Sequence, residues 1–444
     1  MKESVDFPDT VLEETIRWAI PRPRGNIYKY DLEQLTELGT PQNSISDLTG
    51  LEYATGLEEL EVRDGQISDI SPLASLTSLE ELNLPNNLVN DISPLTDLTE
   101  LTKLNLCSNM IGDISPLANL TKLTRLWLSY NQIGDISSLT HLTNLRNLSL
   151  DNNRIGDISS LANLINLIGL DLINNQIGNV SSLGNLTNLR SLSLRHNRIG
   201  DISPLSNLTN LRELSVASNQ ASDISPLANL TGLTRLDLYG NKISDVSPLA
   251  NLTELAVLSL GYNQISDISP LTNLTNLNWL GLWTNPVDDI SPLSNLTNLK
   301  VLWLGGNRMI RDISPLADLV NLGTLKLWDT GISNLSPLAR LINLEMLHIP
   351  SGRVSDISPL VHLTALTELD LSDNKIGDIS PLANLANLTS VNLRRNQIMD
   401  ISALVQNEGL GMEGKVDLCG NPLSSDSINT YIPQLRARGV NVDY

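Results

Sequence analysis

The chain has 444 residues and a formal net charge of −20, with 49 acidic against 29 basic side chains. This balance argues against nucleic-acid binding, because no basic field is available to neutralise phosphates. Phe7 is the single phenylalanine, so Leu and Ile must fill the interior, and the six tryptophans are expected to lie outside it. No run of about 18 apolar residues occurs, which excludes a membrane-spanning helix.

Residues 1–34 do not repeat and are expected to form an N-terminal helical cap that covers the leucines of the first coil. Thr10 and Glu13 form a capping-box pattern, and Pro21 is expected to end the helix. The apolar residues of one helical face are Leu12, Ile16, Ala19 and Ile20. The opening MKESVDFPD lacks a basic segment followed by an apolar stretch, so no export signal is expected in the chain as written.

Residues 35–409 are expected to be an array of about 17 copies of one 22-residue repeat, LxxLxLxxNxIxDISPLxxLTN. A degenerate first copy, Leu35 to Gly56, keeps Asn43, Ile45 and Asp47 in phase, and the copy that opens at Leu299 is one residue longer. The other copies open at Leu57, Leu79, Leu101, Leu123, Leu145, Leu167, Leu189, Leu211, Leu233, Leu255, Leu277, Leu322, Leu344, Leu366 and Leu388.

Each repeat contains its own structural signals. LxxLxL alternates as a short strand with its leucines inward, so repeat positions 2, 3, 5, 7 and 8 point outward. Asn at position 9 is suited to satisfying backbone groups of adjacent turns. Asp at position 13 is expected to accept hydrogen bonds from turn amides, and Ser-Pro to place a hydroxyl cap before a short 3₁₀-like turn.

This period and its LxxLxLxxN core resemble the leucine-rich repeat family, most closely the bacterial 22-residue class of internalin-like proteins. The resemblance implies an α/β repeat fold, a right-handed curved solenoid with parallel strands on its concave face and short 3₁₀-like turns on its convex face. It also implies a protein partner and a location at a surface, although the fold alone does not fix a function.

Residues 410–444 are expected to form a C-terminal strand–helix cap. The segment Lys415 to Leu423 has the pattern of one more strand. Ser424 to Gly439 carries apolar residues at helical spacing, and Pro433 is expected to kink or divide that helix.

Aromatic residues gather at the outward positions of the repeat, and they are the main candidate binding residues. They are Trp127, Tyr130, Tyr239, Tyr262, Trp279, Trp283, Trp303 and Trp328. Rigid aromatic surface dominates protein interfaces and also stacks on sugar rings, so these residues predict a binding stripe on the concave face. The alternative is that aromatic side chains simply suit strands and pack across neighbouring coils.

The same face is expected to carry zones of charge that fix the register of a partner and speed its approach. Its middle repeats are basic, with Arg190, Arg195, Arg212 and Arg235 as candidate partner-binding residues, whereas its first and last repeats are acidic. The alternative is that these charged side chains are only solvated and contact no partner.

The sequence gives no sign of catalysis, and we expect neither a cofactor nor a metal. One carboxylate per coil at position 13 is a poor calcium site without a second acidic column, and the four histidines form no ligand-spaced pair. Gly409 to Gly414 matches GxGxxG but precedes a strand instead of opening a helix. Cys107 and Cys419 lie too many coils apart for a disulfide.

The sequence therefore predicts a monomeric, non-enzymatic module that binds a macromolecular partner, a protein in the first place, on its concave face. A glycan-binding or adhesin-type protein and an intracellular scaffold or phosphatase-regulator-like protein are the alternatives. Nucleic acid and membrane insertion are not expected, and the compartment is left open.

Overall fold

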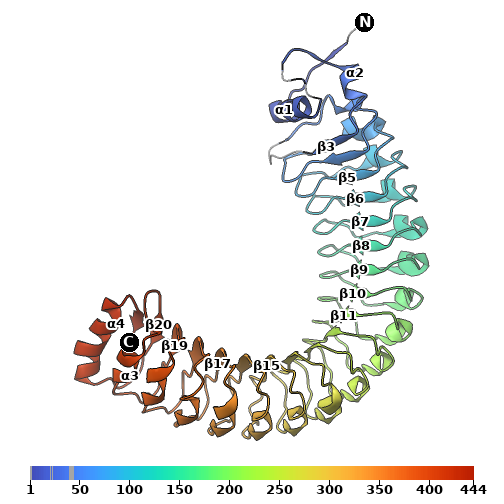
Figure 1. The fold of residues 1–444 in the computed structure, drawn as a ribbon. Helices are drawn as coiled ribbons and strands as arrows, with labels where there is room; N and C mark the ends of the chain where they lie inside the picture. The colour runs from blue at the N-terminus through green and yellow to red at the C-terminus, as the bar shows by residue number, and fades with distance from the viewer. Residues whose placement is uncertain (1–2, 21, 23, 40–44) are drawn as a thin grey trace. The chain divides into compact units, whose positions relative to one another are not determined.

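The computed structural model describes residues 3–20, 22, 24–39 and 45–444. The chain divides into two compact units, Met1–Gln220 and Ala221–Tyr444, and each is described by itself. In both units the strands line one side and short 3₁₀ turns line the other (Figure 1). This arrangement is the solenoid architecture that the repeat predicts.

Each repeat contributes one three-residue strand to a parallel sheet. The first unit contains β3 (Glu37–Gly39), β4 (Glu59–Glu61), β5 (Glu81–Asn83), β6 (Lys103–Asn105), β7 (Arg125–Trp127), β8 (Asn147–Ser149), β9 (Gly169–Asp171), β10 (Ser191–Ser193) and β11 (Glu213–Ser215). The second contains β12 (Arg235–Asp237), β13 (Val257–Ser259), β14 (Trp279–Gly281), β15 (Val301–Trp303), β16 (Thr324–Lys326), β17 (Met346–His348), β18 (Glu368–Asp370), β19 (Ser390–Asn392), β20 (Lys415–Asp417) and β21 (Asn441–Asp443).

The strands of most successive repeats are in register because the repeat length is 22 residues, and the extra residue of the repeat that opens at Leu299 lies after its strand. Leu60 pairs with Leu82, and Leu82 with Leu104, so the same repeat position falls on each successive rung. These central leucines are buried, whereas their neighbours in each strand face out. We call the surface formed by repeat positions 2, 3, 5, 7 and 8 the sheet face.

The opposite side of each unit is made of 3₁₀ turns. In the first unit these are η1 (Leu51–Tyr53), η2 (Ser71–Ser75), η3 (Ser93–Leu95), η4 (Ser115–Leu117), η5 (Ser137–His141), η6 (Ser159–Asn163), η7 (Ser181–Leu183) and η8 (Ser203–Asn207). In the second they are η9 (Ser225–Leu227), η10 (Ser247–Leu249), η11 (Ser269–Asn273), η12 (Ser291–Leu293), η13 (Ser314–Leu316), η14 (Ser336–Arg340), η15 (Ser358–Leu360) and η16 (Ser380–Asn384).

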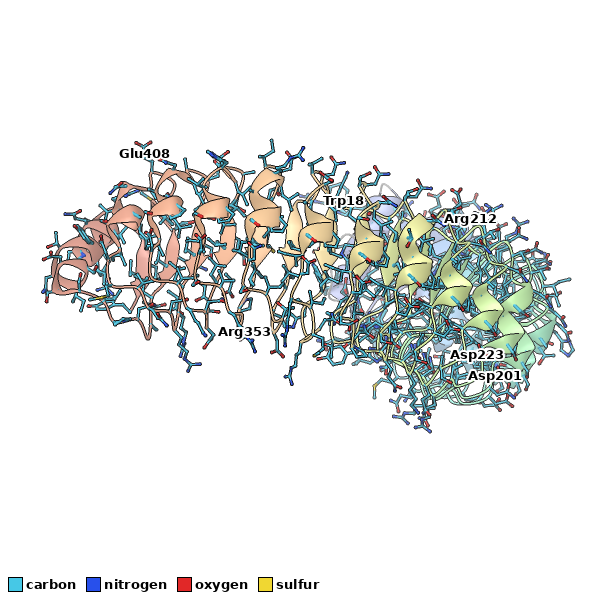
Figure 2. The ribbon with its side chains drawn as sticks, turned by 90° about the horizontal axis from the view of Figure 1, so that it is seen from below. Trp18, Asp201, Arg212, Asp223, Arg353 and Glu408 are labelled. Atoms are coloured by element: carbon cyan, nitrogen blue, oxygen red, sulfur yellow. The ribbon has the colours of Figure 1, made fainter. Side chains whose placement is uncertain are left out.

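The cap of these turns differs from the expected one. The acceptor of the turn N–H is the Asp of position 13, and in turns such as η4 the Ser hydroxyl itself donates to that Asp, as Ser115 does to Asp113 at 3.0 Å. Asp201 and Asp223, both labelled in Figure 2, accept from the backbone N–H of Ser203 and Ser225 at 2.8 Å. The carboxylate accepts from the free backbone N–H of the residue two positions later. The prediction that Asp accepts hydrogen bonds from turn amides is therefore confirmed, and the prediction of a serine hydroxyl cap was wrong.

The Asn column at position 9 has its expected structural role. Asn109 donates from Nδ2 to the backbone oxygens of Leu84 (2.9 Å) and Leu106 (3.1 Å), and its Oδ1 accepts from Val89 N at 3.0 Å. One side chain thereby joins two coils at a buried site. Asn43, which falls in the first copy, lies outside the described residues.

Residues at repeat position 8 have a positive φ wherever the structure describes them, from Asp64 to Arg395, a feature that sequence reasoning missed. Tyr130, Tyr262 and Thr284 are held near +55°, although such side chains rarely adopt this conformation. The turn after each strand demands it, and it aims the side chain of position 8 at the rim of the sheet face.

The N-terminal segment contains the expected helix, α1 (Thr10–Ala19), but with a different cap. The carboxylate of Asp9 accepts from Val11 N (2.9 Å) and Leu12 N (3.1 Å), which makes Asp9 the N-cap. Glu13 instead pairs with Arg17 at 2.6 Å, so the proposed capping box was wrong. Pro21 lies outside the described residues, whereas the antiparallel pair β1 (Ser4–Val5) and β2 (Ile27–Tyr28) and the helix α2 (Lys29–Leu32) were not anticipated.

The C-terminal segment contains the expected strand β20 and the expected helix. A π-helical turn, η17 (Ser427–Tyr431), runs without a break into α4 (Ile432–Ala437), so Pro433 lies within a continuing helix, directly after the π-helical turn. The short helix α3 (Ser402–Gln406) and the last strand β21 were missed. Among the described residues, no helix combines the length and apolar character that a membrane crossing needs.

Candidate functional site

Five aromatic side chains on the sheet face of the second unit touch one another. Tyr239 lies against Trp283, with centroids 5.5 Å apart, and edge-on to Tyr262 at 5.4 Å. Trp279 and Trp303 each lie edge-on to Trp283, and their own centroids are 5.3 Å apart. We call these five residues the aromatic cluster. It spans four successive repeats that are linked by in-register strands.

Two rings of the aromatic cluster, Trp279 and Trp283, and the adjacent Trp328 rest on glycines. A Cβ atom at Gly281 would overlap the ring of Trp283 and would lie 2.7 Å from the ring of Trp279. A Cβ at Gly261 would also overlap Trp283, and one at Gly305 would overlap Trp328. The rings of Trp279, Trp283 and Trp328 therefore lie directly on glycine backbone, and all three side chains are half-buried.

Charged groups border the aromatic cluster. Lys326 Nζ lies 4.9 Å from the centroid of the Trp303 ring, within the range of a cation–π contact. On the following strands, His348 Nε2 is 2.8 Å from Glu368 Oε1. On the other side, Arg235 and Trp279 line a shallow hollow of about 310 Å³.

The indole N–H of Trp303 is buried and has no hydrogen-bond partner among the described residues. An unpaired buried donor costs about 1–3 kcal/mol. The contacts of the same ring with Trp279, Trp283 and Lys326 offset this cost.

The remaining candidate residues lie on the sheet face of the first unit. Trp127 is half-buried, and Tyr130 is exposed; neither takes part in a ring contact among the described residues. Arg190 and Arg195 are exposed. Arg212 turns back toward its own backbone and donates to Leu211 O at 3.1 Å.

Cysteine and acidic side chains show no reactive arrangement in the part of the chain that the structure describes. There, no group of three His, Cys, Asp or Glu side chains is placed to hold a metal ion. Burial raises the pKa of the Cys107 thiol, which disfavours the nucleophilic thiolate. Backbone hydrogen bonds from Ser93 and Ser225 lower the pKa values of Asp91 and Asp223, as expected for carboxylates that act as structural acceptors.

Comparison with known families and structures gives a consistent result. The family description "Leucine Rich repeats (2 copies)" matches residues 55–98, 77–119, 99–141, 121–164, 187–229, 231–273, 275–318 and 364–406. No curated protein sequence matches the chain.

Three solved structures illustrate the similarity. An internalin (inlF) from Listeria monocytogenes is 33% identical over 92% of this chain and 96% of its own, with a TM-score of 0.48. A leucine-rich repeat protein of Leptospira interrogans is 23% identical over 91% and 100%, with a TM-score of 0.72. The Arabidopsis receptor kinase HAESA, in complex with the peptide hormone IDA and the co-receptor SERK1, is 23% identical over 84% and 67%, with a TM-score of 0.66. The chain therefore belongs to the leucine-rich repeat family, and its 22-residue repeat is that of the bacterial, internalin-like class.

Proposed function

We propose that this chain is a non-enzymatic interaction protein that binds a protein partner on its sheet face, with the aromatic cluster and Trp328 as the central contact surface. The observation that carries the proposal is the set of solvent-accessible rings that contact one another, with Trp279 and Trp283 lying on glycine backbone. Large aromatic side chains with few rotatable bonds provide most of the binding energy in protein interfaces. A leucine-rich repeat fold is a scaffold for such interactions, as the HAESA complex illustrates for another protein.

The mutual packing of the rings favours a protein over a glycan. Trp279, Trp283 and Trp303 meet at interplanar angles of 60° to 88°, so they make one uneven apolar surface. Stacking on a sugar needs a flat ring with its face open. The charged groups beside the rings, Lys326 and Arg235, give the surface the polar rim that protein interfaces have.

Arg235 is proposed as a steering group beside the aromatic cluster in the second unit. On the sheet face of the first unit, the proposed additional steering and peripheral groups are Arg190, Arg195, Arg212, Trp127 and Tyr130. Exposed charges of this kind raise association rates more than affinity. Their removal is expected to slow binding, particularly at low ionic strength.

Photo-crosslinking tests the proposal. A benzoylphenylalanine at position 283 should trap a protein partner, whereas the same probe at the exposed Trp18 of α1 should not. Trp283→Ala and Trp303→Ala should then weaken binding of the trapped partner by about tenfold or more, while Trp18→Ala leaves it unchanged. Unchanged affinity in both cluster variants would contradict the proposal. Glycans bound on an array by the wild type and lost in Trp283→Ala would favour the glycan alternative.

A further inference from the structure

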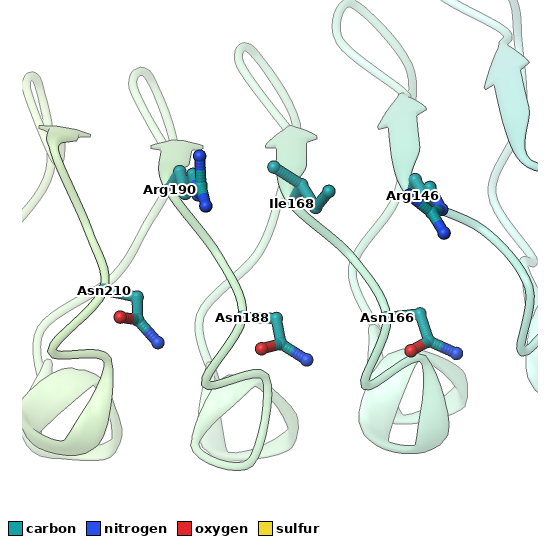
Figure 3. Close-up of a pocket in the computed structure, with 6 residues that line it drawn as sticks. All are labelled: Arg146, Asn166, Ile168, Asn188, Arg190 and Asn210. Atoms are coloured by element: carbon teal, nitrogen blue, oxygen red, sulfur yellow. The ribbon is translucent and has the colours of Figure 1, made fainter.

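A second hollow lies at the edge of the sheet face of the first unit and is lined by two kinds of polar group (Figure 3). Arg146, Ile168 and Arg190 project from the strand side, and a row of asparagine amides lies along the neighbouring loops. The hollow measures about 280 Å³, and the asparagines are Asn166, Asn188 and Asn210. We call this site the arginine groove.

The two arginines stand at a fixed separation. Ile168 N donates to Arg146 O at 2.7 Å, and Arg190 N donates to Ile168 O at 2.8 Å, so the three residues occupy successive rungs of one ladder. Two rungs of a parallel sheet correspond to about 9.6 Å. The backbone therefore sets the distance between the bases of the two arginines, with an apolar side chain between them.

Neither guanidinium is neutralised by the protein. Arg146 and Arg190 form no ion pair among the described residues. The adjacent outward positions on β8, β9 and β10 are the uncharged Asn147, Gly169 and Ser191. The groove thus presents two exposed positive charges next to uncharged strand positions, and the outward acid on these three strands, Asp171, follows two residues farther along β9.

The asparagine row supplies one hydrogen-bond acceptor per coil, at the same interval as the rungs of the strand ladder that carries the arginines. Asn166, Asn188 and Asn210 each donate from Nδ2 to the backbone of the preceding coil at 2.9 Å. This bond fixes the amide plane and leaves the Oδ1 atoms as acceptors, one per coil.

We propose that the arginine groove binds an acidic peptide segment in the polyproline II conformation, with two carboxylates three residues apart. Polyproline II rises about 3.1 Å per residue with three residues per turn, so side chains at i and i+3 share a face about 9.3 Å apart. That distance matches the two rungs between Arg146 and Arg190. A β-strand does not match, because its i and i+3 side chains point to opposite faces.

Each part of the ligand has a partner in the groove. The two carboxylates pair with Arg146 and Arg190, and a proline between them packs on Ile168. Polyproline II has no internal hydrogen bonds, so the N–H groups of its acidic residues are free to donate to the asparagine Oδ1 atoms.

Fluorescence anisotropy with short labelled peptides tests this proposal. The probe is a proline-rich peptide with two glutamates three residues apart, and the matched controls place them two residues apart or replace both by glutamine. The first peptide should bind with a salt-sensitive affinity at least about tenfold above both controls. Arg146→Gln and Arg190→Gln should each weaken it about tenfold, whereas Arg154→Gln, at an exposed arginine outside the groove, should have no effect.

Equal binding of the two glutamate spacings, or unchanged binding in Arg146→Gln and Arg190→Gln, would overturn the proposal. Competition by single-stranded RNA that is as strong as competition by the probe would show a general anion site and would also overturn it. Trp283→Ala should bind the peptide normally, since the aromatic cluster is separate from the groove in sequence and residue content. Arg190 belongs to both proposals, so Trp283→Ala and Arg146→Gln are the variants whose effects separate the two sites.

Discussion

At the scale of single residues, the glycines under the tryptophans determine the shape of the sheet face. Gly261, Gly281 and Gly305 lie where any Cβ would enter an indole ring. A ring on bare backbone is both lower and more tightly fixed than one that stands among side chains. These glycines therefore belong to the candidate site although they offer no group for binding.

Gly281→Ala is predicted to displace the ring of Trp283 and to destabilise the chain by about 1–3 kcal/mol, the usual cost of overpacking. The loss should appear in urea unfolding, together with a shift in tryptophan fluorescence of the folded state. Gly323→Ala is the matched control, because the nearest atom to its added Cβ is 3.7 Å away. Equal stability of the two variants would contradict the role given to Gly281.

The repeat predicted which aromatic side chains face outward, but it did not predict that their rings contact one another. Counting repeat positions places Trp283 and Trp303 outward, but no local rule states that their rings meet. A usable signal was present: Gly261 and Gly305 occupy the same repeat position as Trp283 and Trp328, one repeat earlier. A glycine directly preceding a tryptophan in the column predicts that the ring lies back over the earlier coil.

At the scale of one element, three of the 3₁₀ turns have a serine in place of the usual proline. Ser138, Ser160 and Ser182 occupy the place that proline holds in most other repeats, and their hydroxyls are buried without a hydrogen-bond partner in the described structure. The neighbouring turn η4, which has proline there, adopts nearly the same geometry: φ of the preceding cap residue is −113° in η4 and −118° in η5.

Replacement of these three serines by proline is predicted to stabilise the chain by about 0.4–1 kcal/mol each, because proline restricts the unfolded chain and the unpaired hydroxyl is removed. Thermal and urea unfolding measure the gain. Ser137→Pro is the control with the opposite sign, since it removes the N–H that donates to Asp135 at 2.8 Å. A loss of stability in Ser138→Pro would show that the turn depends on that residue's own N–H.

The carboxylates before the turns predict a dependence of stability on pH. Two hydrogen bonds from the serine two residues later lower the pKa of a set of exposed aspartates. The bond from the backbone N–H has the larger effect and the bond from the hydroxyl the smaller. The aspartates are Asp91, Asp135, Asp223, Asp267, Asp312 and Asp356. A carboxyl whose folded pKa is depressed stabilises the fold above its unfolded pKa of about 3.9. That contribution is lost as the pH falls through the lower, folded value.

Changing these six aspartates to asparagine is predicted to flatten the loss of stability below about pH 4. Asparagine keeps the acceptor without titrating, as Asn179 and Asn334 already show by accepting from Ser181 N and Ser336 N at 2.9 Å. Urea midpoints at neutral pH and below pH 4 give the comparison. If the stability of the variant fell with pH below about 4 as steeply as that of the wild type, other carboxylates would be responsible for the acid sensitivity.

Caps were the elements that sequence reasoning predicted least well. Thr10 and Glu13 fit a capping box, yet Asp9 caps α1, because one carboxylate reaches the N–H groups of Val11 and Leu12 and also Ser46 N at 2.7 Å. The contact with Ser46 is made by a residue far along the chain, which a local motif does not include. The same limit applies to β21, whose pairing with β20 depends on the fold of the preceding helix.

At the scale of the molecule, the constant repeat makes neighbouring coils interchangeable. Asn109 donates to Leu84 O at 2.9 Å, and Asn131 donates to Leu106 O at the same distance. Stability of such arrays is close to a sum over repeats and their nearest-neighbour interfaces. The fold was therefore predictable from the period, since almost every long-range contact is a copy of one contact between successive coils.

Removal of one whole repeat, residues 101–122, is predicted to leave a folded chain with lower stability. After the deletion, β7 meets β5 in the register that β6 now occupies, and Asn131 reaches Leu84 O as Asn109 does now. The circular dichroism spectrum should keep its shape. The midpoint of unfolding should fall, because one interface between neighbouring coils is lost. Removal of half a repeat, residues 101–111, should unfold this region, since the next leucines and the next asparagine then fall out of register. If both deletions gave the same stability, the repeat would not be the unit of folding.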